Sequence, residues 1–400
     1  MPDAVIVATG RTPIGRAMKG SLVSCRPDDL SALVIKEVLA KVPQLDPALV
    51  EDVILGCGQP AGEAGYNVAR VAAILAGVDV PGVTVNRYCS SSLQTIRMAA
   101  HAIRAGEGDV FVAAGVETVS RFQFGASDTG PHNQHFADGE ARTAKRNPAV
   151  TEPWTPLGGL PDVYIAMGQT AENVAEYENV GREEMDEFAA LSQNRAVESQ
   201  KNGFFEREII PVTLEDGTVV TTDDGPRPDT TVEKLATLKP AFREGGKITA
   251  GNACPLNDGA AAVVVMSDTK AAELGITPLA RIVASGVSAL DPEIMGLGPI
   301  EACRQALRRA GMTIDDIDLV EINEAFAAQV IPSAKHLGIP WEKLNVKGGA
   351  IALGHPFGMT GARIMTTLLN ALEDEDKRIG LESMCVGGGQ GMAMIVERLT

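Results

Sequence analysis

Aromatic side chains are scarce in this sequence, at 4% of 400 residues, whereas glycine occurs 42 times. This balance argues against an aromatic-rich β-sandwich and favours the tight turns and close backbone approaches of a layered α/β protein. No apolar run approaches the roughly 20 residues that cross a bilayer, so no membrane span is expected. The 45% hydrophobic content predicts a large core, divided over two or three domains.

Positive charge is also in short supply, because 35 Lys and Arg face 52 Asp and Glu and leave a net charge of -17. Nucleic acids and membrane surfaces need contiguous positive potential, so neither is expected as a partner. An anionic ligand would have to meet a local basic patch. Arg142, Lys145 and Arg146 are interpreted as surface charge, with a local anion site as the alternative.

Paired cysteines of the C-x-x-C kind are missing. The six cysteines are scattered, at positions 25, 57, 89, 254, 303 and 385, which argues against structural zinc or a dithiol redox centre. His132 and His135 lack a third ligand at suitable spacing, so we expect a solvated loop and no metal. A reducing compartment fits best. Because MPDAVIVATGRTPIG lacks the flank and core of a signal peptide, we expect cytoplasmic residence.

A weak internal repeat organises the chain. The first half contains a predicted helix, loop and strand that end in LDPALVEDVILGCG, and the same order recurs in the second half, ending in MTIDDIDLVEINEAF. The next segment of the first half, GVTVNRYCSSSLQTIRMAAHAIRAG, corresponds to LNVKGGAIALGHPFGMTGARIMTTLLNAL in the second. The short apolar runs DVILG, GVTV, DVFVAA, AAVVVM, DLVEI and AMIVE predict buried strands. Helices between them imply parallel pairing. We therefore expect two stacked, similar βαβ-rich halves.

A region rich in Gly, Pro, Asn and charge interrupts the repeat and is interpreted as an inserted loop domain. The predicted boundaries are 1–118 for the first half, completed by about 251–270, then 119–250 for the insert and 271–400 for the second half. Within the insert, TAENVAEYENV and REEMDEFAALSQNRAVESQKNG predict helices, the second ending at a glycine.

Cys89 lies in VNRYCSSSLQTI, between a predicted strand and a predicted helix. A free cysteine at an arbitrary site usually packs in a core. At a helix start, however, unpaired N–H groups and the helix dipole stabilise a thiolate and lower the pKa of the thiol from its usual value of about 8.5. The position therefore indicates a nucleophile.

Two glycine-rich segments in the second half complete the set. His355 lies in NVKGGAIALGHPFGMTGAR, at the place that Cys89 occupies in the first half, and Cys385 precedes three glycines in MCVGGGQGMAMIVE. The second segment lacks room for the helix of a dinucleotide fingerprint, and its glycines are interpreted as bringing backbone N–H groups to a substrate oxygen. Asn323 in EINEAFAAQ follows a strand, where a turn or helix cap is the alternative.

These motifs together resemble the thiolase superfamily: N-R-x-C-x-S-x-L-Q, N-E-A-F, G-G-A-I-A-L-G-H-P-x-G-x-x-G-A-R and C-x-G-G-G-Q-G, in this order over essentially the whole chain. The resemblance implies a five-layered αβαβα fold. It also implies that Cys89 accepts the acyl group, that His355 is the base that activates the Cys89 thiol, and that Cys385 is the acid and base of the carbon–carbon bond step. Asn323 would hold a water that forms one oxyanion hole with His355, and the N–H groups of Cys89 and Gly387 would form the other.

The resemblance further implies thiolytic cleavage of a 3-ketoacyl-CoA to acetyl-CoA, in a homodimer or dimer of dimers, with coenzyme A as substrate and without a cofactor. Ala166 stands where acetoacetyl-specific members commonly carry histidine, which favours a degradative enzyme of fatty acid β-oxidation. Alternatives are a biosynthetic acetoacetyl-CoA thiolase, a decarboxylating ketoacyl synthase and an inactive CoA-binding subunit. Residues expected along the CoA and acyl path are Arg227, Cys254, Met167, Phe326 and Met295. Cys254 replaces the serine of many relatives beside the pantetheine.

Overall fold

The computed structural model describes residues 2–146, 153–156 and 158–400. Part of the predicted insert, residues 147–152 and 157, lies outside the described residues. The main sheet has ten strands, and its first half runs in the order β1, β8, β5, β3, β4, with β2 beside β8. These strands are β1 (Ala4–Arg11), β2 (Gly15–Arg16), β3 (Asp52–Cys57), β4 (Gly82–Val85), β5 (Val110–Thr118) and β8 (Asn257–Ser267).

The second half of the sheet runs in the order β10, β11, β12, β9, and a short pairing of β9 with β1 joins the halves. Its strands are β9 (Ala280–Ala289), β10 (Leu319–Ile322), β11 (Ile379–Val386) and β12 (Gln390–Arg398). The predicted parallel pairing holds only in part. β3 is parallel to β4 and β5, and β10 to β11, but β8 and β9 pair antiparallel with their neighbours, as does β12 with β11. For β11 and β12 the reason is local, because a three-glycine turn joins the two strands and a turn so short permits only a hairpin.

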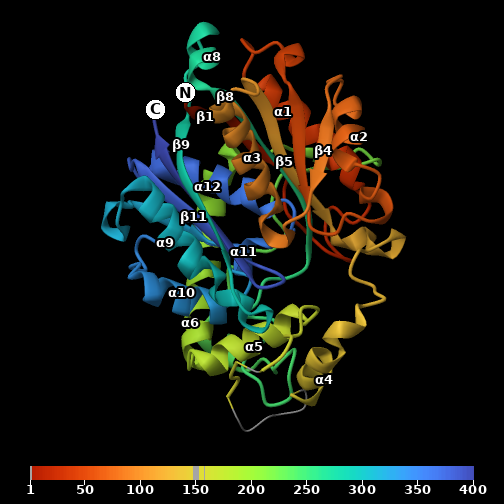
Figure 1. Ribbon diagram of the computed structural model, residues 1–400, viewed down its shortest axis with the longest axis vertical. Helices are drawn as coiled ribbons and strands as arrows, with labels where there is room; N and C mark the ends of the chain where they lie inside the picture. The colour runs from red at the N-terminus through yellow and green to blue at the C-terminus, as the bar shows by residue number, and fades with distance from the viewer. Residues whose placement is uncertain (1, 147–152, 157) are drawn as a thin grey trace.

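Five layers follow from the helices (Figure 1). α1 (Pro27–Ala40) and α2 (Val68–Leu75) cover the outside of the first half, whereas α9 (Gly298–Ala310) and α10 (Ala327–Leu337) cover the second. The middle layer consists of α3 (Ser91–Ala105) and α12 (Thr360–Asp374), which contact each other. α12 packs on strands of both halves, whereas α3 packs on strands of the first half and reaches β9 through the side chains of Arg97 and Arg104. The expected αβαβα arrangement is confirmed.

Alternate residues of each strand enter different cores, because successive side chains of a strand point to opposite faces. In β5, Val112 and Ala114 pack with α1 and α2, whereas Ala113 faces the middle layer. In β12, Met394 faces the middle layer and Ile395 the outer helices of the second half. Both faces of each strand are thus covered, which explains the unbroken apolar runs of the sequence.

The region between β5 and β8 contributes most of the remaining elements. Its helices α5 and α6 agree with the two predicted ones, and Gly203, in the left-handed conformation at φ 82°, follows α6. The domain boundaries themselves stay a prediction. Among the described residues, none of the helices is both long and apolar enough to span a membrane. The remaining elements are α4 (Ala137–Lys145), α5 (Met167–Tyr177), α6 (Arg182–Lys201), β6 (Val212–Thr213), β7 (Val219–Val220), α7 (Val232–Ala236), α8 (Asp268–Glu273) and α11 (Ala350–Leu353).

Candidate active site

Cys89 lies in a sharp turn between β4 and α3, within the short 3-10 helix Tyr88–Ser90. Tyr88 adopts the left-handed conformation, at φ 41°, which is costly for a non-glycine residue. Two side chains hold this turn, since the Asn86 Oδ1 accepts from the Tyr88 N–H at 2.8 Å and the Ser91 Oγ accepts from the Arg87 N–H at 2.9 Å. The turn places a thiol that is only 8% exposed directly before α3.

The electrostatics of Cys89 differ from the sequence prediction of a lowered pKa, which is wrong. Burial raises the pKa of the Cys89 thiol to about 11, although the N–H groups of Gly387 and of Cys89 itself point at the sulfur and partly oppose this effect. The carboxylate of Glu117 raises the pKa further. Loss of solvation outweighs two hydrogen bonds here, so the resting thiol is protonated at neutral pH.

Gly387 reaches Cys89 from the turn between β11 and β12. The two following residues, Gly388 and Gly389, have φ of 76° and 77°, a conformation that glycine adopts without strain. Cys385, at the end of β11, is fully buried, and burial together with the nearby thiols of Cys89 and Cys254 raises its pKa. The turn therefore brings Gly387 and Cys385 to Cys89, and Cys254, from the segment before β8, lies near both thiols.

His355 lies between α11 and α12, and its side chain contacts Asn323. The Asn323 Nδ2 lies 3.3 Å from Nε2 and 3.4 Å from Nδ1 of the imidazole. The Thr360 Oγ1 lies 2.6 Å from Nδ1 and donates its single proton to the Pro356 carbonyl at 2.8 Å. With that proton on the Pro356 carbonyl, Nδ1 carries the imidazole proton and Nε2 is left unprotonated, facing the Asn323 amide.

Burial and the nearby Arg363 guanidinium lower the pKa of His355 to about 3, so this imidazole is neutral at physiological pH. A neutral imidazole can accept a proton from a neutral thiol at the moment of attack. The backbone of Asn323 also lies next to β11, the strand that carries Cys385, because the Asn323 N–H donates to the Ser383 carbonyl at 2.9 Å. The Asn323 Oδ1 is buried and meets no hydrogen-bond donor among the described residues.

Close contacts join α3 and α12, the two helices of the middle layer, beside the site. The Ala362 N–H of α12 donates to the Ser92 Oγ of α3 at 2.9 Å. A Cβ at Gly361 would lie 2.3 Å from the Leu93 nitrogen, and one at Gly358 would lie 2.2 Å from the Val116 carbonyl oxygen. Only glycine permits these approaches, which explains why so many glycines surround His355.

Four of the five residues expected along the CoA and acyl path lie in one apolar cluster. Met295 and Phe326 belong to the same core cluster as Cys385, and Met167 and Cys254 pack against it. Arg227 does not join them; it is exposed on a loop, with its backbone N–H donating to the Gln193 Oε1 at 2.9 Å. The binding roles of all five remain predictions.

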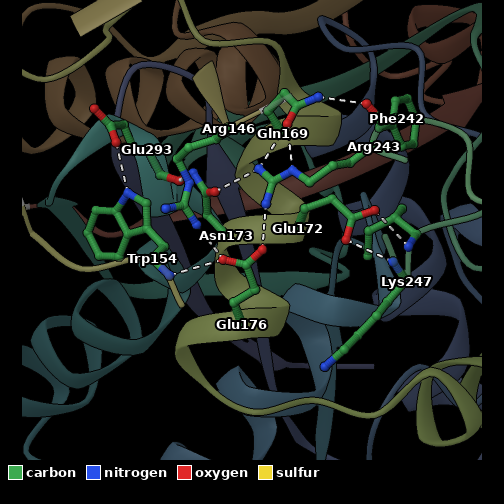
Figure 2. A network of polar contacts seen from close by, with 11 residues as sticks. Arg146, Trp154, Gln169, Glu172, Asn173, Glu176, Phe242, Arg243, Lys247 and Glu293 are labelled. Atoms are coloured by element: carbon green, nitrogen blue, oxygen red, sulfur yellow. Dashed lines mark hydrogen bonds and ion pairs between the residues drawn. The ribbon is translucent and has the colours of Figure 1, made fainter. Parts of the chain in front are cut away.

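A polar network fixes the elements that carry Met167 and Met295 (Figure 2). The Arg243 guanidinium donates to Gln169, Asn173 and Glu176, which all lie on α5. On the other side, Glu293 accepts from the indole N–H of Trp154 at 2.8 Å. The network holds α5, the 242–248 turn and the 3-10 helix Pro292–Leu297 in one arrangement.

The predicted loop histidines and basic residues also have identifiable positions. The His132 ring stacks on Tyr164 and pairs with Glu140 at 3.0 Å, and the described part of the chain holds no group of three side chains suited to a metal ion. Arg146 pairs with Glu176, and the Arg142 Nη2 lies 3.8 Å from Glu293. These two arginines are therefore parts of an ion-pair network and are only partly exposed.

Sequence reasoning missed the buried Glu117 carboxylate and the Thr360 hydroxyl, and it noted Glu324 beside Asn323 after a strand without recognising it as a buried acceptor. Each lies within a quoted motif or directly after a predicted strand. None stood out, because nothing in their local sequence distinguishes a buried acceptor of backbone N–H groups from a solvated side chain.

The comparisons with known proteins define the class. Over 100% of this chain and 99% of the other, the structure is similar to the crystal structure of the Bacillus anthracis acetyl-CoA acetyltransferase, with a TM-score of 0.85 and 40% identity. A 3-oxoadipyl-CoA/3-oxo-5,6-dehydrosuberyl-CoA thiolase of Escherichia coli K12 is 45% identical, and both chains are covered fully. A 3-ketoacyl-CoA thiolase of Saccharophagus degradans is also 45% identical, over 99% of this chain and 98% of its own. The protein is therefore an acyltransferase.

Two family models divide nearly the whole chain between them. "Thiolase, N-terminal domain" matches residues 4–269 and "Thiolase, C-terminal domain" matches residues 276–398. The chain belongs to the thiolase family.

Proposed function

We propose that this thiolase cleaves a 3-ketoacyl-CoA with coenzyme A, giving acetyl-CoA and a shortened acyl-CoA through an acyl group on Cys89. The observation that carries this proposal is the contact of the Gly387 turn with the Cys89 turn, where a Cβ at Gly387 would lie 3.5 Å from the Tyr88 ring and where the N–H groups of Gly387 and Cys89 both lower the pKa of the Cys89 thiol. Donors beside the sulfur also lie beside any carbon bonded to it. They are thus positioned for the oxyanion of a tetrahedral intermediate, where one donor contributes about 3 to 4 kcal/mol.

In the first half-reaction, the Cys89 sulfur attacks the 3-keto carbon while its proton passes to the His355 Nε2. The new oxyanion is stabilised by the two N–H groups. The bond between C2 and C3 then breaks, and its electron pair stays on the acetyl-CoA fragment as a thioester enolate. Asn323 and His355 stabilise that enolate oxygen, and Cys385 protonates the enolate carbon.

In the second half-reaction, the thiol of a new coenzyme A attacks the acyl-Cys89 thioester. The Cys385 thiolate left by the first half-reaction accepts the thiol proton, and the protonated His355 returns its proton to the departing Cys89 sulfur, so that all three groups regain their resting state. The same steps in reverse form a Claisen condensation. The buried, neutral state of Cys89 and His355 is consistent with this scheme, because neither of these two groups carries a charge at rest and proton transfer accompanies each attack.

Substrate choice is the finer part of the proposal. We expect chains longer than acetoacetyl-CoA and a place in fatty acid β-oxidation, because Ala166 replaces the histidine of acetoacetyl-specific relatives. The relatives' names add 3-oxoadipyl-CoA, which carries a terminal carboxylate, as a second candidate. Acetoacetyl-CoA, suggested by the name of the solved relative, is the third.

The test is turnover of a panel of 3-ketoacyl-CoAs with coenzyme A, followed by the loss of enolate absorbance. The panel contains acetoacetyl-CoA, 3-oxoadipyl-CoA and straight-chain substrates of increasing length. We expect turnover by the wild type and none above background by Cys89→Ala. A Cys89→Ala protein that turns over at the wild-type rate would rule out the acyl-cysteine mechanism.

The homodimer belongs to the proposal as well. β4 is the outermost strand of the first half, with its outer backbone edge unpaired in the sheet order. Exposed apolar side chains gather around it, namely Tyr66 at 87%, Ile74 at 58%, Leu75 at 53%, Tyr88 at 44% and Val83 at 38% exposure. An open edge with an apolar surround favours pairing with a second copy. Cytoplasmic residence stays a prediction.

A further inference from the structure

The His355 segment depends on contacts from outside itself. Between α11, which ends at Leu353, and α12, which begins at Thr360, the backbone belongs to neither a helix nor a strand. Its position is therefore set by what its N–H groups meet. One anchor is direct, because the His355 N–H donates to the Asn257 Oδ1 at 3.0 Å.

A buried carboxylate holds the chain just before this segment. Glu324, fully buried, accepts from the Ile351 N–H at 3.1 Å and from the Ser192 hydroxyl at 2.6 Å through Oε2. Its Oε1 accepts from the Asn345 side-chain amide at 2.8 Å. A Cβ at Gly349 would lie 2.2 Å from the Glu324 carboxyl carbon, so the backbone at Gly349 is in direct contact with the carboxylate.

A second buried carboxylate holds the segment after His355. Glu117, 1% exposed near the end of β5, accepts through Oε2 from the Gly358 N–H at 2.9 Å and from the Gly58 N–H at 2.8 Å. Its Oε1 accepts from the Gln59 N–H at 3.2 Å. One side chain thus joins the loop after β3 in the first half to the His355 segment of the second.

We propose that Glu117 and Glu324 are positioning residues that hold the two ends of the His355 segment and thereby aim its imidazole. A carboxylate suits this task because it is an acceptor on both oxygens, whereas an amide would turn a donor toward at least one of these N–H groups. The inference rests on the proposed role of His355. It adds the residues through which that role depends on the first half of the molecule.

The surroundings of Glu117 support the assignment and provide a readout. Burial raises the pKa of Glu117 to about 7, against the opposing effect of its three N–H donors. The titratable groups near it are Cys57, whose sulfur lies 3.7 Å from Oε1, and Cys89, whose pKa it raises. Glu63 and Arg121, which line the same small pocket, pair with each other. Removing the charge of Glu117 should therefore lower the pKa of the Cys89 thiol.

The experiment compares Glu117→Gln and Glu324→Gln with a matched control, Asp318→Asn. Asp318 also accepts two backbone N–H groups, from Arg378 and Ile379 at 3.0 and 2.8 Å, but it lies just before β10, at the opposite end of the strand from Asn323. We expect each Glu→Gln variant to lose about 10- to 100-fold in kcat, as a misplaced catalytic group does, with the KM for coenzyme A unchanged. The control should keep the wild-type kcat.

The rate of Cys89 alkylation by iodoacetamide against pH gives the second measurement. In Glu117→Gln the profile should move to lower pH, because the negative charge that raises the Cys89 pKa is removed. In Glu324→Gln, which loses an anchor of the same segment without removing a charge that acts on Cys89, it should stay in place. Wild-type kcat in both folded variants would overturn the inference. If Glu117→Gln does not fold, Glu324→Gln alone decides. The proposed function fails separately, if Cys89→Ala remains active.

Discussion

Burial governs the chemistry of the reactive side chains. The thiol of Cys89 has its pKa raised to about 11 and the imidazole of His355 has its pKa lowered to about 3, in both cases chiefly because the charged form loses solvation. Both groups are therefore neutral at rest. The helix start that drew attention to Cys89 contributes only the Cys89 N–H, while the Gly387 N–H comes from the turn after β11, and the effect of both on the pKa of the thiol is smaller than that of burial.

This state predicts how Cys89 reacts with iodoacetamide. Because only the thiolate reacts, and the pKa is raised to about 11, the alkylation rate should rise about tenfold per pH unit from about pH 7 to about pH 10. Peptide mass spectrometry separates Cys89 from the partly exposed Cys25 and Cys254. A plateau below about pH 9 would show instead that the site stabilises a thiolate.

Residue identities could be predicted where an unusual residue stands in a marked position. Cys89 before a helix, His355 among glycines and Cys385 before a glycine turn were all recognisable. The pKa of Cys89 could not be predicted, because its sign depends on how completely the rest of the chain buries the sulfur. The role of Glu117 could not be predicted for the same reason, because its burial also depends on the rest of the chain.

At the scale of the elements, glycines decide how closely the two halves of the site approach. The turn after His355 lies on the ends of β3 and β5, and a Cβ at Gly358 would lie 2.7 Å from the Gly56 carbonyl oxygen and 2.9 Å from the Cys57 Cα. These are backbone atoms, so no side-chain rotation relieves the contact.

Gly358→Ala should therefore destabilise the protein by about 1 to 3 kcal/mol and reduce kcat, because the His355 segment must move away from the sheet. Urea unfolding and the thiolysis assay measure the two effects. The matched control is Gly181→Ala, at the start of α6, where an added Cβ would meet nothing within 4 Å and φ is -79°. Equal stabilities of the two variants would contradict the proposed contact.

The positions of strands could be predicted from the apolar runs of the sequence, and all six predicted strands are present. Their directions did not follow, because the alternation of helices and strands suggested parallel pairing throughout. β8 pairs antiparallel with β5 across about 140 residues of intervening chain, and no local pattern reports such a return.

At the scale of the whole molecule, the two halves meet through the middle layer of α3 and α12, and the site lies where these helices begin. The internal repeat predicted this arrangement, because equivalent units place Cys89 and His355 at equivalent helix starts. The inserted region stays a prediction from composition, and composition does not report the polar network that joins Arg243 and Trp154 of that region to Glu293, which lies outside the predicted bounds (Figure 2).

The open edge of β4 predicts a dimer in solution. Val83→Lys would place a charge in the apolar surround of that edge and should shift the protein toward the monomer, as measured by light scattering after size-exclusion chromatography. Val219→Lys, at a valine 54% exposed on β7, should leave the dimer intact. A dimer that survives Val83→Lys unchanged would place the interface elsewhere.

The central claim is that Cys89 carries the acyl group while Cys385 only moves a proton. The most direct measurement is mass spectrometry of the Cys385→Ala variant after incubation with an acyl-CoA. We predict an acyl adduct on the peptide that contains Cys89, together with loss of carbon–carbon bond exchange. In wild-type protein treated in the same way, an adduct confined to the Cys385 peptide, or the absence of any adduct on Cys89 in both proteins, would contradict the account.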